Sequence, residues 1–336
     1  MDPVCHTLVG LALAEAGLKH RAPAATATLM LGANLPDVDV ASYAWGSLAA
    51  LSFRRGWTHG VPALVVLPLV LATLVFGALR WRGLRRGETL ERTAFAQLTF
   101  LSYVSVLTHP LLDALNTYGM RWLMPFANRW FYADTLFIVD PWVWGCLAAG
   151  AWMARKRRSG RPARVALAMV MAYIVAMWTG TTVVRHQARA ATETALGHPA
   201  AGVLVSPVPM IPWERLVVVD DGERYRFGRH RWFRRPGFAL GDYAVQKNHR
   251  HPAALVAAAT PDGAAFLRWA RLPFFVVVGH RGGTTVHIVD ARYTADPAAG
   301  FGAFTIELAT GVGLNTEGGR RREAGAARPS LGRRGG

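Results

Sequence analysis

Apolar residues along positions 1–184 gather in long blocks, which form three pairs of segments joined by basic loops. The run 61–79 has no charged residue over 19 positions, enough for a helix to cross about 30 Å of hydrocarbon. The run 165–184 is a second clear span, and its alanines at four-residue spacing favour close helix packing. The remaining runs are shorter, at 4–18, 22–35, 94–107 and 141–153. The pattern therefore predicts three helical hairpins.

The shorter runs set the expected number of membrane crossings. The first hairpin is borderline in length, and the run 94–107 carries Gln and Ser, which favours a position inside the bundle. Arg185 ends the last apolar run. We therefore predict an α-helical membrane bundle of four to six membrane helices over residues 1–185.

Beyond residue 185 the chain changes to β-branched and aromatic runs separated by Gly, Pro and Asp, a pattern typical of strands. Strands are predicted at 215–219, 274–278, 284–289 and 301–308, with a hairpin turn at 279–283. We expect a β-rich soluble domain at 200–312 and a disordered Gly/Arg-rich tail at 315–336.

Basic residues are distributed unequally between the two ends of the predicted hairpins. The chain has 38 Lys and Arg against 21 Asp and Glu. Thirteen of the basic residues lie at the hairpin tips of residues 1–184 and four on the other side, namely Arg54, Arg55, Arg121 and Arg129. Membrane orientation explains this asymmetry, whereas nucleic-acid binding does not predict it, so we expect no nucleic-acid partner. The basic tips are predicted to be cytoplasmic, which places the C-terminal domain outside the inner membrane.

Histidines and aspartates lie at the ends of the hairpins opposite the basic tips. His109 and Asp113 are four residues apart, which puts both on one face of a helix. Asp37 and Asp39 follow the second apolar run, and His59 precedes the third. Imidazole and carboxylate are suitable ligands for zinc and related divalent metals. Ionisable groups at membrane depth are costly and usually functional, so the set is a candidate metal site.

Each of these motifs also has a structural interpretation. Asp37 and Asp39 are equally typical of a helix-terminating turn and a cap. Arg54 and Arg55 are suited to binding a phosphate, or to extending toward lipid headgroups. Asp140 precedes Pro141, as an N-cap does, or it is a ligand or a partner that orients one.

The motifs together resemble a known family, the bacterial and archaeal inner-membrane metal-dependent hydrolases, formerly a family of unknown function with an SOS-regulated enterobacterial member. The resemblance covers about residues 1–185 and rests on His6 with its apolar helix, Asn34-Leu-Pro-Asp37-Val-Asp39, Arg55-Gly-Trp-Thr-His59-Gly, Thr108-His109-Pro-Leu-Leu-Asp113-Ala-Leu-Asn116 and Tyr132-Ala-Asp134-Thr-Leu-Phe-Ile-Val-Asp140. It implies that the metal-site residues are His6, Asp37, His59, His109 and Asp113. It implies supporting roles for Asp39, Asn116, Asp134 and Asp140.

We therefore expect a membrane-bound hydrolase that uses a divalent metal, with zinc as the first candidate. Asp39 and Asp140 are the candidate general bases, and Arg54 and Arg55 are the candidates for orienting an anionic headgroup. The expected substrate is an anionic small molecule or lipid, of the phosphoester or phospholipid type, met at the extracytoplasmic interface among membrane lipids.

Two other functions remain open from the sequence. A transporter or proton-relay protein would also carry buried His and Asp residues, but near the middle of broken helices. A non-catalytic metal-binding scaffold would hold the same ligands without turnover.

Overall fold

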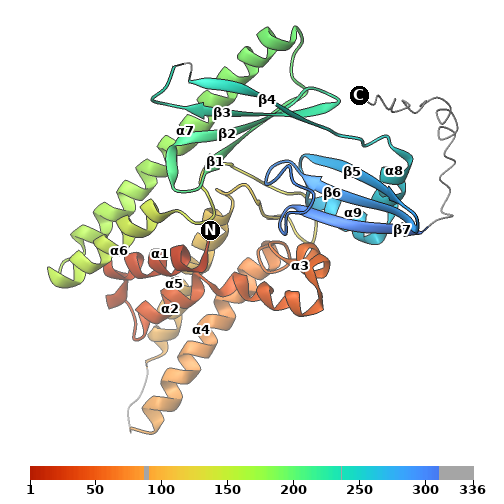
Figure 1. The fold of residues 1–336 in the computed structure, drawn as a ribbon. Coiled ribbons are helices and arrows are strands. Elements are labelled where there is room, and N and C mark those ends of the chain that lie inside the picture. The colour runs from red at the N-terminus through yellow and green to blue at the C-terminus, as the bar shows by residue number, and fades with distance from the viewer. Residues whose placement is uncertain (87–90, 236, 310–336) are drawn as a thin grey trace, which may run out of the picture.

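Three helical hairpins form the N-terminal part of the protein in the computed structural model, which describes residues 1–86, 91–235 and 237–309 (Figure 1). The hairpins are α1 (Pro3–Glu15) with α2 (Ala25–Gly32), α4 (Val61–Leu84) with α5 (Arg92–Asp113), and α6 (Pro141–Lys156) with α7 (Arg161–Leu196). Short helices η1 (Leu18–His20), η2 (Leu35–Trp45) and α3 (Ser47–Phe53) lie in the connections of the first half. The predicted tail at 315–336 lies outside the described residues.

The helices confirm the predicted α-helical membrane bundle. Within the described ranges, three helices are long and apolar enough to cross a membrane: α4, α5 from Thr93, and α7. Of these, α5 is the most buried, as its Gln and Ser predicted. The other helices of the hairpins are shorter, at 13 residues for α1, 8 for α2 and 16 for α6. The predicted four to six membrane helices would therefore have to include one or more of these shorter helices as well as the three long ones.

Small residues let the first hairpin lie close against its neighbours. A Cβ at Gly10 of α1 would stand 2.5 Å from the carbonyl oxygen of Leu29 in α2. A Cβ at Gly32 would stand 2.0 Å from Ser105 Oγ of α5. Close approach of helix backbones is how membrane helices gain packing contacts. The first hairpin is therefore held between α5 and α6 and is an integral part of the bundle.

Two helices continue further than their sequence pattern indicated. The apolar run 94–107 belongs to α5, which runs unbroken through Pro110 to Asp113. Likewise α7 does not end with the apolar run at Arg185 but continues to Leu196. Val184 and Ala188 of α7 are buried against Val205 and Val217 of the first sheet, so the sheet stabilises these last turns.

Two antiparallel sheets follow α7 and confirm the predicted β-rich domain. The first has strand order β1 (Gly202–Val208), β2 (Ile211–Asp220), β3 (Arg224–Arg231) and β4 (Phe238–Gln246). The second has the order β5 (Pro273–His280), β6 (Gly283–Asp290) and β7 (Ala303–Ala309). The four predicted strands fall in β2, β5, β6 and β7, and the predicted turn joins β5 to β6.

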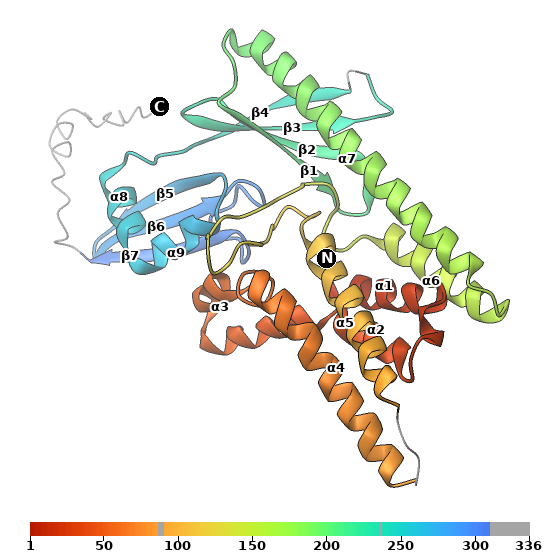
Figure 2. The same cartoon turned by 180° about the vertical axis from the view of Figure 1, so that it is seen from behind.

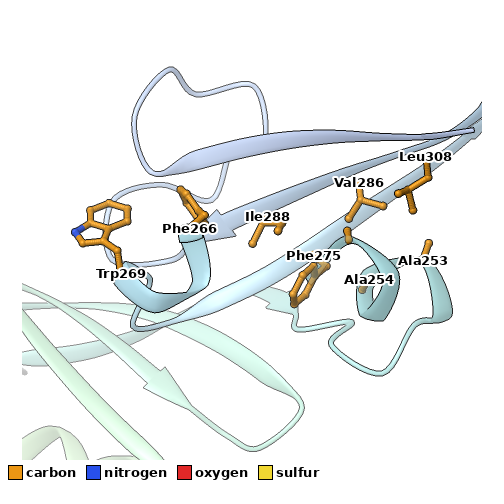
Figure 3. Close-up of a cluster of buried hydrophobic side chains, with 9 residues drawn as sticks. Ala253, Ala254, Phe266, Trp269, Phe275, Val286, Ile288 and Leu308 are labelled. Carbon is orange, nitrogen blue, oxygen red and sulfur yellow. The ribbon is translucent and has the colours of Figure 1, made fainter. Parts of the chain in front are cut away.

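The sheets share a core and are covered by helices that the sequence pattern did not reveal. Alternate residues of β2 face opposite ways: Val217 packs toward α7, whereas Val218 joins Phe274 and Val289 of the second sheet. Helices α8 (Pro252–Ala259) and α9 (Pro261–Trp269) cover one face of the second sheet. Figure 3 shows the core between these two helices and the second sheet, in which Phe266 of α9 lies near Ile288 of β6.

The two ends of the bundle differ in what surrounds them. The turns of the first and third hairpins are joined by Glu15, which pairs with Lys19 at 2.6 Å and with Arg155 at 2.7 Å. The tips of α4–α5 and α6–α7 point away from both sheets (Figures 1 and 2). The sheets and the connection 114–140 lie at the opposite end, where the predicted site residues are.

Candidate metal centre

Four ionisable side chains from three segments converge at the end of the bundle opposite the basic tips. Asp37 lies in η2, His59 lies in the loop before α4, and His109 and Asp113 lie one turn apart at the end of α5. Ligand atoms of these four residues all lie within 4.8 Å of one another. Asp37 is half-buried and the other three are buried. The structure thus brings together four of the five predicted metal-site residues.

Hydrogen bonds on the far side of each imidazole direct a lone pair into the cluster. His109 Nδ1 lies 2.7 Å from the carbonyl oxygen of Ala33, which can only accept, so Nδ1 carries the proton. His59 Nδ1 lies 2.9 Å from Thr58 Oγ1 and 3.4 Å from an Asp39 carboxylate oxygen. With both Nδ1 atoms protonated, the two Nε2 atoms face each other as acceptors at 3.0 Å. A cation between them removes this repulsion, and metal-binding histidines are oriented in the same way.

Two carboxylate oxygens complete the set of donors. Asp113 Oδ2 lies 3.4 Å from His59 Nε2 and 3.5 Å from His109 Nε2. Asp37 Oδ1 lies 3.7 Å from His109 Nε2 and 4.0 Å from His59 Nε2. Both oxygens are buried and have no hydrogen-bond partner among the described residues. Two imidazole nitrogens and two carboxylate oxygens facing one point fit a divalent cation such as zinc.

Burial favours the neutral imidazole that a metal requires. Burial is the main cause that lowers the pKa of His59, and the nearby His109 acts in the same direction, while Asp113 opposes it. His59 is therefore neutral near pH 7, which leaves its Nε2 lone pair available.

His6, the fifth predicted ligand, lies directly beside the cluster. Its ring stacks on His109 with centroids 3.9 Å apart, and its Nε2 lies 3.4 Å from Asp113 Oδ1. The same Asp113 oxygen accepts a hydrogen bond from the amino group of Met1. Both ring nitrogens of His6 are buried without a hydrogen-bond partner in the described part of the chain. His6 is thus placed to extend the site on the α1 side.

Asp39 is a candidate base whose two carboxylate oxygens both accept hydrogen bonds from neighbouring residues. Its Oδ2 accepts hydrogen bonds from the backbone N–H of Arg55 at 2.8 Å and from Thr58 Oγ1 at 2.9 Å. Its Oδ1 accepts from Arg54 Nε at 3.2 Å. Asp39 therefore holds the loop that carries His59 and orients the imidazole.

The two arginines predicted to bind an anion differ in exposure. Arg55 is 3% exposed, and its Nε lies 3.5 Å from Asp113 Oδ2. Its charge balances Asp113 within the protein. The Arg54 side chain is 19% exposed and lies on the cluster's rim beside Asp37. Although burial acts against it, Asp39 and Tyr43 raise the pKa of Arg54, so the side chain stays cationic. Arg54 is the arginine of this pair that a ligand can reach.

The remaining supporting candidates lie outside the cluster. Asp140 caps α6 by accepting from the backbone N–H groups of Trp142 and Val143, and it also accepts from Tyr173. Asp134 forms an ion pair with Arg271, at 2.8 Å.

Asn116 lies nearer the cluster. Its Oδ1 accepts from the backbone of Tyr118 and Gly119 and from Arg55 Nη1 at 3.1 Å. Asn116 thus supports the site through Arg55, whereas Asp134 and Asp140 stabilise the fold around it.

Sequence reasoning missed two groups that orient the histidines. The Ala33 carbonyl has no side-chain signal, because any residue supplies a carbonyl. Thr58 had a signal, since it immediately precedes His59 within the quoted motif and has a hydroxyl that can donate to a carboxylate.

Replacing Asp39 with asparagine is expected to weaken metal binding without removing a ligand. The amide keeps the size but supplies one acceptor oxygen in place of two, so the loop and His59 lose part of their support. Loss of such an orienting partner typically costs about 10–100-fold in metal affinity. Competition titration with a chromophoric chelator measures this change. An affinity equal to that of the unaltered protein would show that His59 does not depend on Asp39.

Comparisons with known proteins place the N-terminal part in a described family. The profile of the family described as YdjM inner membrane protein matches residues 1–184. The protein described as uncharacterized protein YfhP of Bacillus subtilis (strain 168) is 21% identical over 154 residues, covering 43% of this chain and 43% of that protein. The match thus spans less than half of that relative. No solved structure matches the chain significantly.

Proposed function

The chain belongs to the YdjM inner membrane protein family, and from this membership and the cluster geometry we propose that it is a membrane-bound metal-dependent hydrolase. The observation that carries the proposal is the convergence of two imidazole lone pairs with one oxygen each of Asp37 and Asp113, neither of which accepts a hydrogen bond from the described residues. A divalent ion held there, with zinc as the first candidate, supplies Lewis acidity and acidifies water.

The protein's own residues divide the work at this centre. His59, His109, Asp37 and Asp113 bind the ion, and His6 lies beside them as a further ligand. Asp39, Thr58 and the Ala33 carbonyl orient the two imidazoles. Asp37 is the half-buried member of the four, so a substrate approaches the centre from its side.

An anionic substrate fits the rim of the site. Arg54 stays cationic, lies 3.9 Å from Asp37 and is partly exposed, so it can orient a phosphate or carboxylate group. Arg54 donates to the Tyr43 hydroxyl and lies against the Tyr43 ring. Tyr43, Trp45 and Trp57 are exposed aromatic side chains of the adjoining segments, as at a membrane interface. We therefore propose a phosphoester or phospholipid-type substrate that is met among membrane lipids.

The position of the cluster favours hydrolysis over a transporter or proton relay. A relay requires ionisable groups along the middle of a span, whereas these residues lie at helix ends and in the adjoining loops. A non-catalytic scaffold would hold the same metal, and turnover is the property that separates it from a hydrolase.

A hydrolysis screen on the purified full-length protein tests the proposal. We expect phosphoester or phospholipid cleavage that stops after chelation and returns on addition of a divalent metal. Arg54→Ala should retain its metal and lose turnover of anionic substrates, whereas Arg129→Ala, an exposed arginine of the following connection, should keep both. Turnover that survives chelation would exclude the metal-dependent mechanism.

We also propose that the basic hairpin tips are cytoplasmic and that the metal centre and the β-rich domain lie outside. In a protein lacking Cys5 and Cys146, we expect an impermeant thiol reagent added from outside to label Phe126→Cys. Phe126 is 79% exposed at the site end. Arg158→Cys lies at an exposed basic tip and should be labelled only after permeabilisation. The reverse labelling pattern would invert the proposed orientation.

A further inference from the structure

A second charged site lies where the connection 114–140 meets α3 and α9. It is a cavity of about 350 Å³, lined by residues of the membrane part and of the β-rich domain. Arg121 and Arg268 both line it, together with Trp130 and Trp269. None of the described residues that line this cavity is Asp or Glu. The cavity is therefore cationic, and none of the four clustered metal-site residues lines it.

Arg121 is a buried cation without a matching anion. It is 3% exposed, and among the described residues no carboxylate lies within ion-pair distance. Its Nη atoms donate to neutral acceptors: Asn128 Oδ1 at 3.0 Å, and the carbonyl oxygens of Ser52 and Arg54 at 2.8 Å each. Its guanidinium also lies 4.7 Å from the Trp130 ring centroid. A buried charge with only neutral partners is costly, and an anion would offset that cost.

Two buried N–H groups of the lining residues lack acceptors. Arg121 Nε and Trp269 Nε1 have no hydrogen-bond partner within the described ranges. A buried donor in this state is destabilising, because it has lost its hydrogen bonds to water without gaining a protein acceptor. Burial is the main cause that lowers the pKa of Arg121, and the positive charge of Arg268 lowers it further. Two neighbouring cations and two free donors are features that an oxyanion satisfies at once.

We propose that this cavity is an oxyanion-binding site that takes a phosphate group. Arg121 and Arg268 supply the charge, and Trp269 supplies a neutral donor. The phosphate belongs either to a soluble phosphate compound or to a lipid headgroup. The exposed Trp57 lines the cavity and the exposed Phe53 lines the adjoining pocket, and exposed aromatic side chains are typical of a membrane interface.

Phosphate titration of the full-length protein tests this site apart from the metal centre. The protein is purified in detergent, treated with chelator and titrated calorimetrically with inorganic phosphate in a phosphate-free buffer. We expect binding that is weakened at least tenfold by Arg268→Gln and is unchanged by Arg281→Gln. Both arginines are exposed, and Arg281 lies in the β5–β6 turn, so neither change should disturb folding. Because metal is absent throughout, the result does not depend on the hydrolase proposal.

A second arm identifies the source of the phosphate. The protein is placed in nanodiscs of phosphatidylcholine alone or of phosphatidylcholine with phosphatidylglycerol. A lipid-headgroup site predicts that phosphatidylglycerol lowers the apparent phosphate affinity, and that Arg268→Gln removes this competition. A site for soluble phosphates predicts the same affinity in both nanodiscs. The proposal is overturned if the unaltered protein does not bind phosphate, or if the Arg268 and Arg281 variants bind it equally well.

Discussion

Replacing His109 with alanine is expected to abolish both metal retention and turnover. His109 supplies one of the two converging Nε2 lone pairs, 3.0 Å from His59 Nε2 and 3.5 Å from Asp113 Oδ2. Its Nδ1 is already held by the Ala33 carbonyl, so the ring is preorganised for ligation. Loss of an orienting partner alone costs about 10–100-fold in metal affinity, and removal of the ligand itself should cost more than about 100-fold.

Metal analysis of the purified protein measures this effect, with turnover recorded on the same samples. His20→Ala is the matched control, because His20 is an exposed histidine in η1, at a basic hairpin tip, beyond the end of α1 that lies away from His6. The control should retain the metal content of the unaltered protein. Equal metal content in the His109 and His20 variants would mean that the cluster is not the metal site.

The amino-acid sequence could predict at which ends of the hairpins the site residues lie. Their positions follow from the limits of the apolar runs, and the pairing of His109 with Asp113 follows from the spacing of residues on one helix face. Both signals are local, so they do not depend on how distant segments fold. The convergence of these residues with His59 and Asp37 then follows from the antiparallel order of short hairpins.

The roles of Asp134 and Asp140 could not be read from local sequence. Asp140 would precede a proline whether it were a helix cap or a metal ligand. Its second carboxylate oxygen accepts a hydrogen bond from Tyr173, which lies in α7. Asp134 is neutralised by Arg271, which is 137 residues away. Whether a carboxylate is a ligand, a cap or half of an ion pair is decided by such long-range contacts. Helices α8 and α9 have only 8 and 9 residues, so they depend on packing against the second sheet, which is also a long-range contact.

These long-range contacts join the β-rich domain to the metal centre. Arg292 follows β6, and its Nη1 donates to the carbonyl oxygen of Thr117 at 3.0 Å. The neighbouring Asn116 holds Arg55, which in turn lies 3.5 Å from Asp113. The connection 114–140 is thus fixed between the two parts of the protein. The second sheet therefore helps to fix the part of this connection from which Asn116 contacts Arg55.

Arg292→Ala is expected to cause the largest loss of stability in the β-rich domain. The guanidinium Nε and Nη2 each lie 2.7 Å from Asp290 Oδ2, and Nη2 also donates to the Trp269 carbonyl oxygen. The side chains of Arg292 and Asp290 are fully buried. Alanine leaves the Asp290 carboxylate buried without its cation and leaves the Thr117 and Trp269 carbonyls without a donor. Removing one member of a buried ion pair costs about 3–5 kcal/mol.

Pulse proteolysis of the full-length protein over a urea series measures the change, because it reports the fraction of unfolded domain at each concentration. Arg250→Ala is the matched control: Arg250 pairs with Glu223, but the two side chains are 79% and 64% exposed. An exposed pair contributes less than about 1 kcal/mol, since water screens its charges, so the control should unfold near the midpoint of the unaltered protein. If Arg292→Ala shifts the midpoint no more than Arg250→Ala does, the contacts of Arg292 with Asp290 and Thr117 do not stabilise the β-rich domain or its link to the connection 114–140.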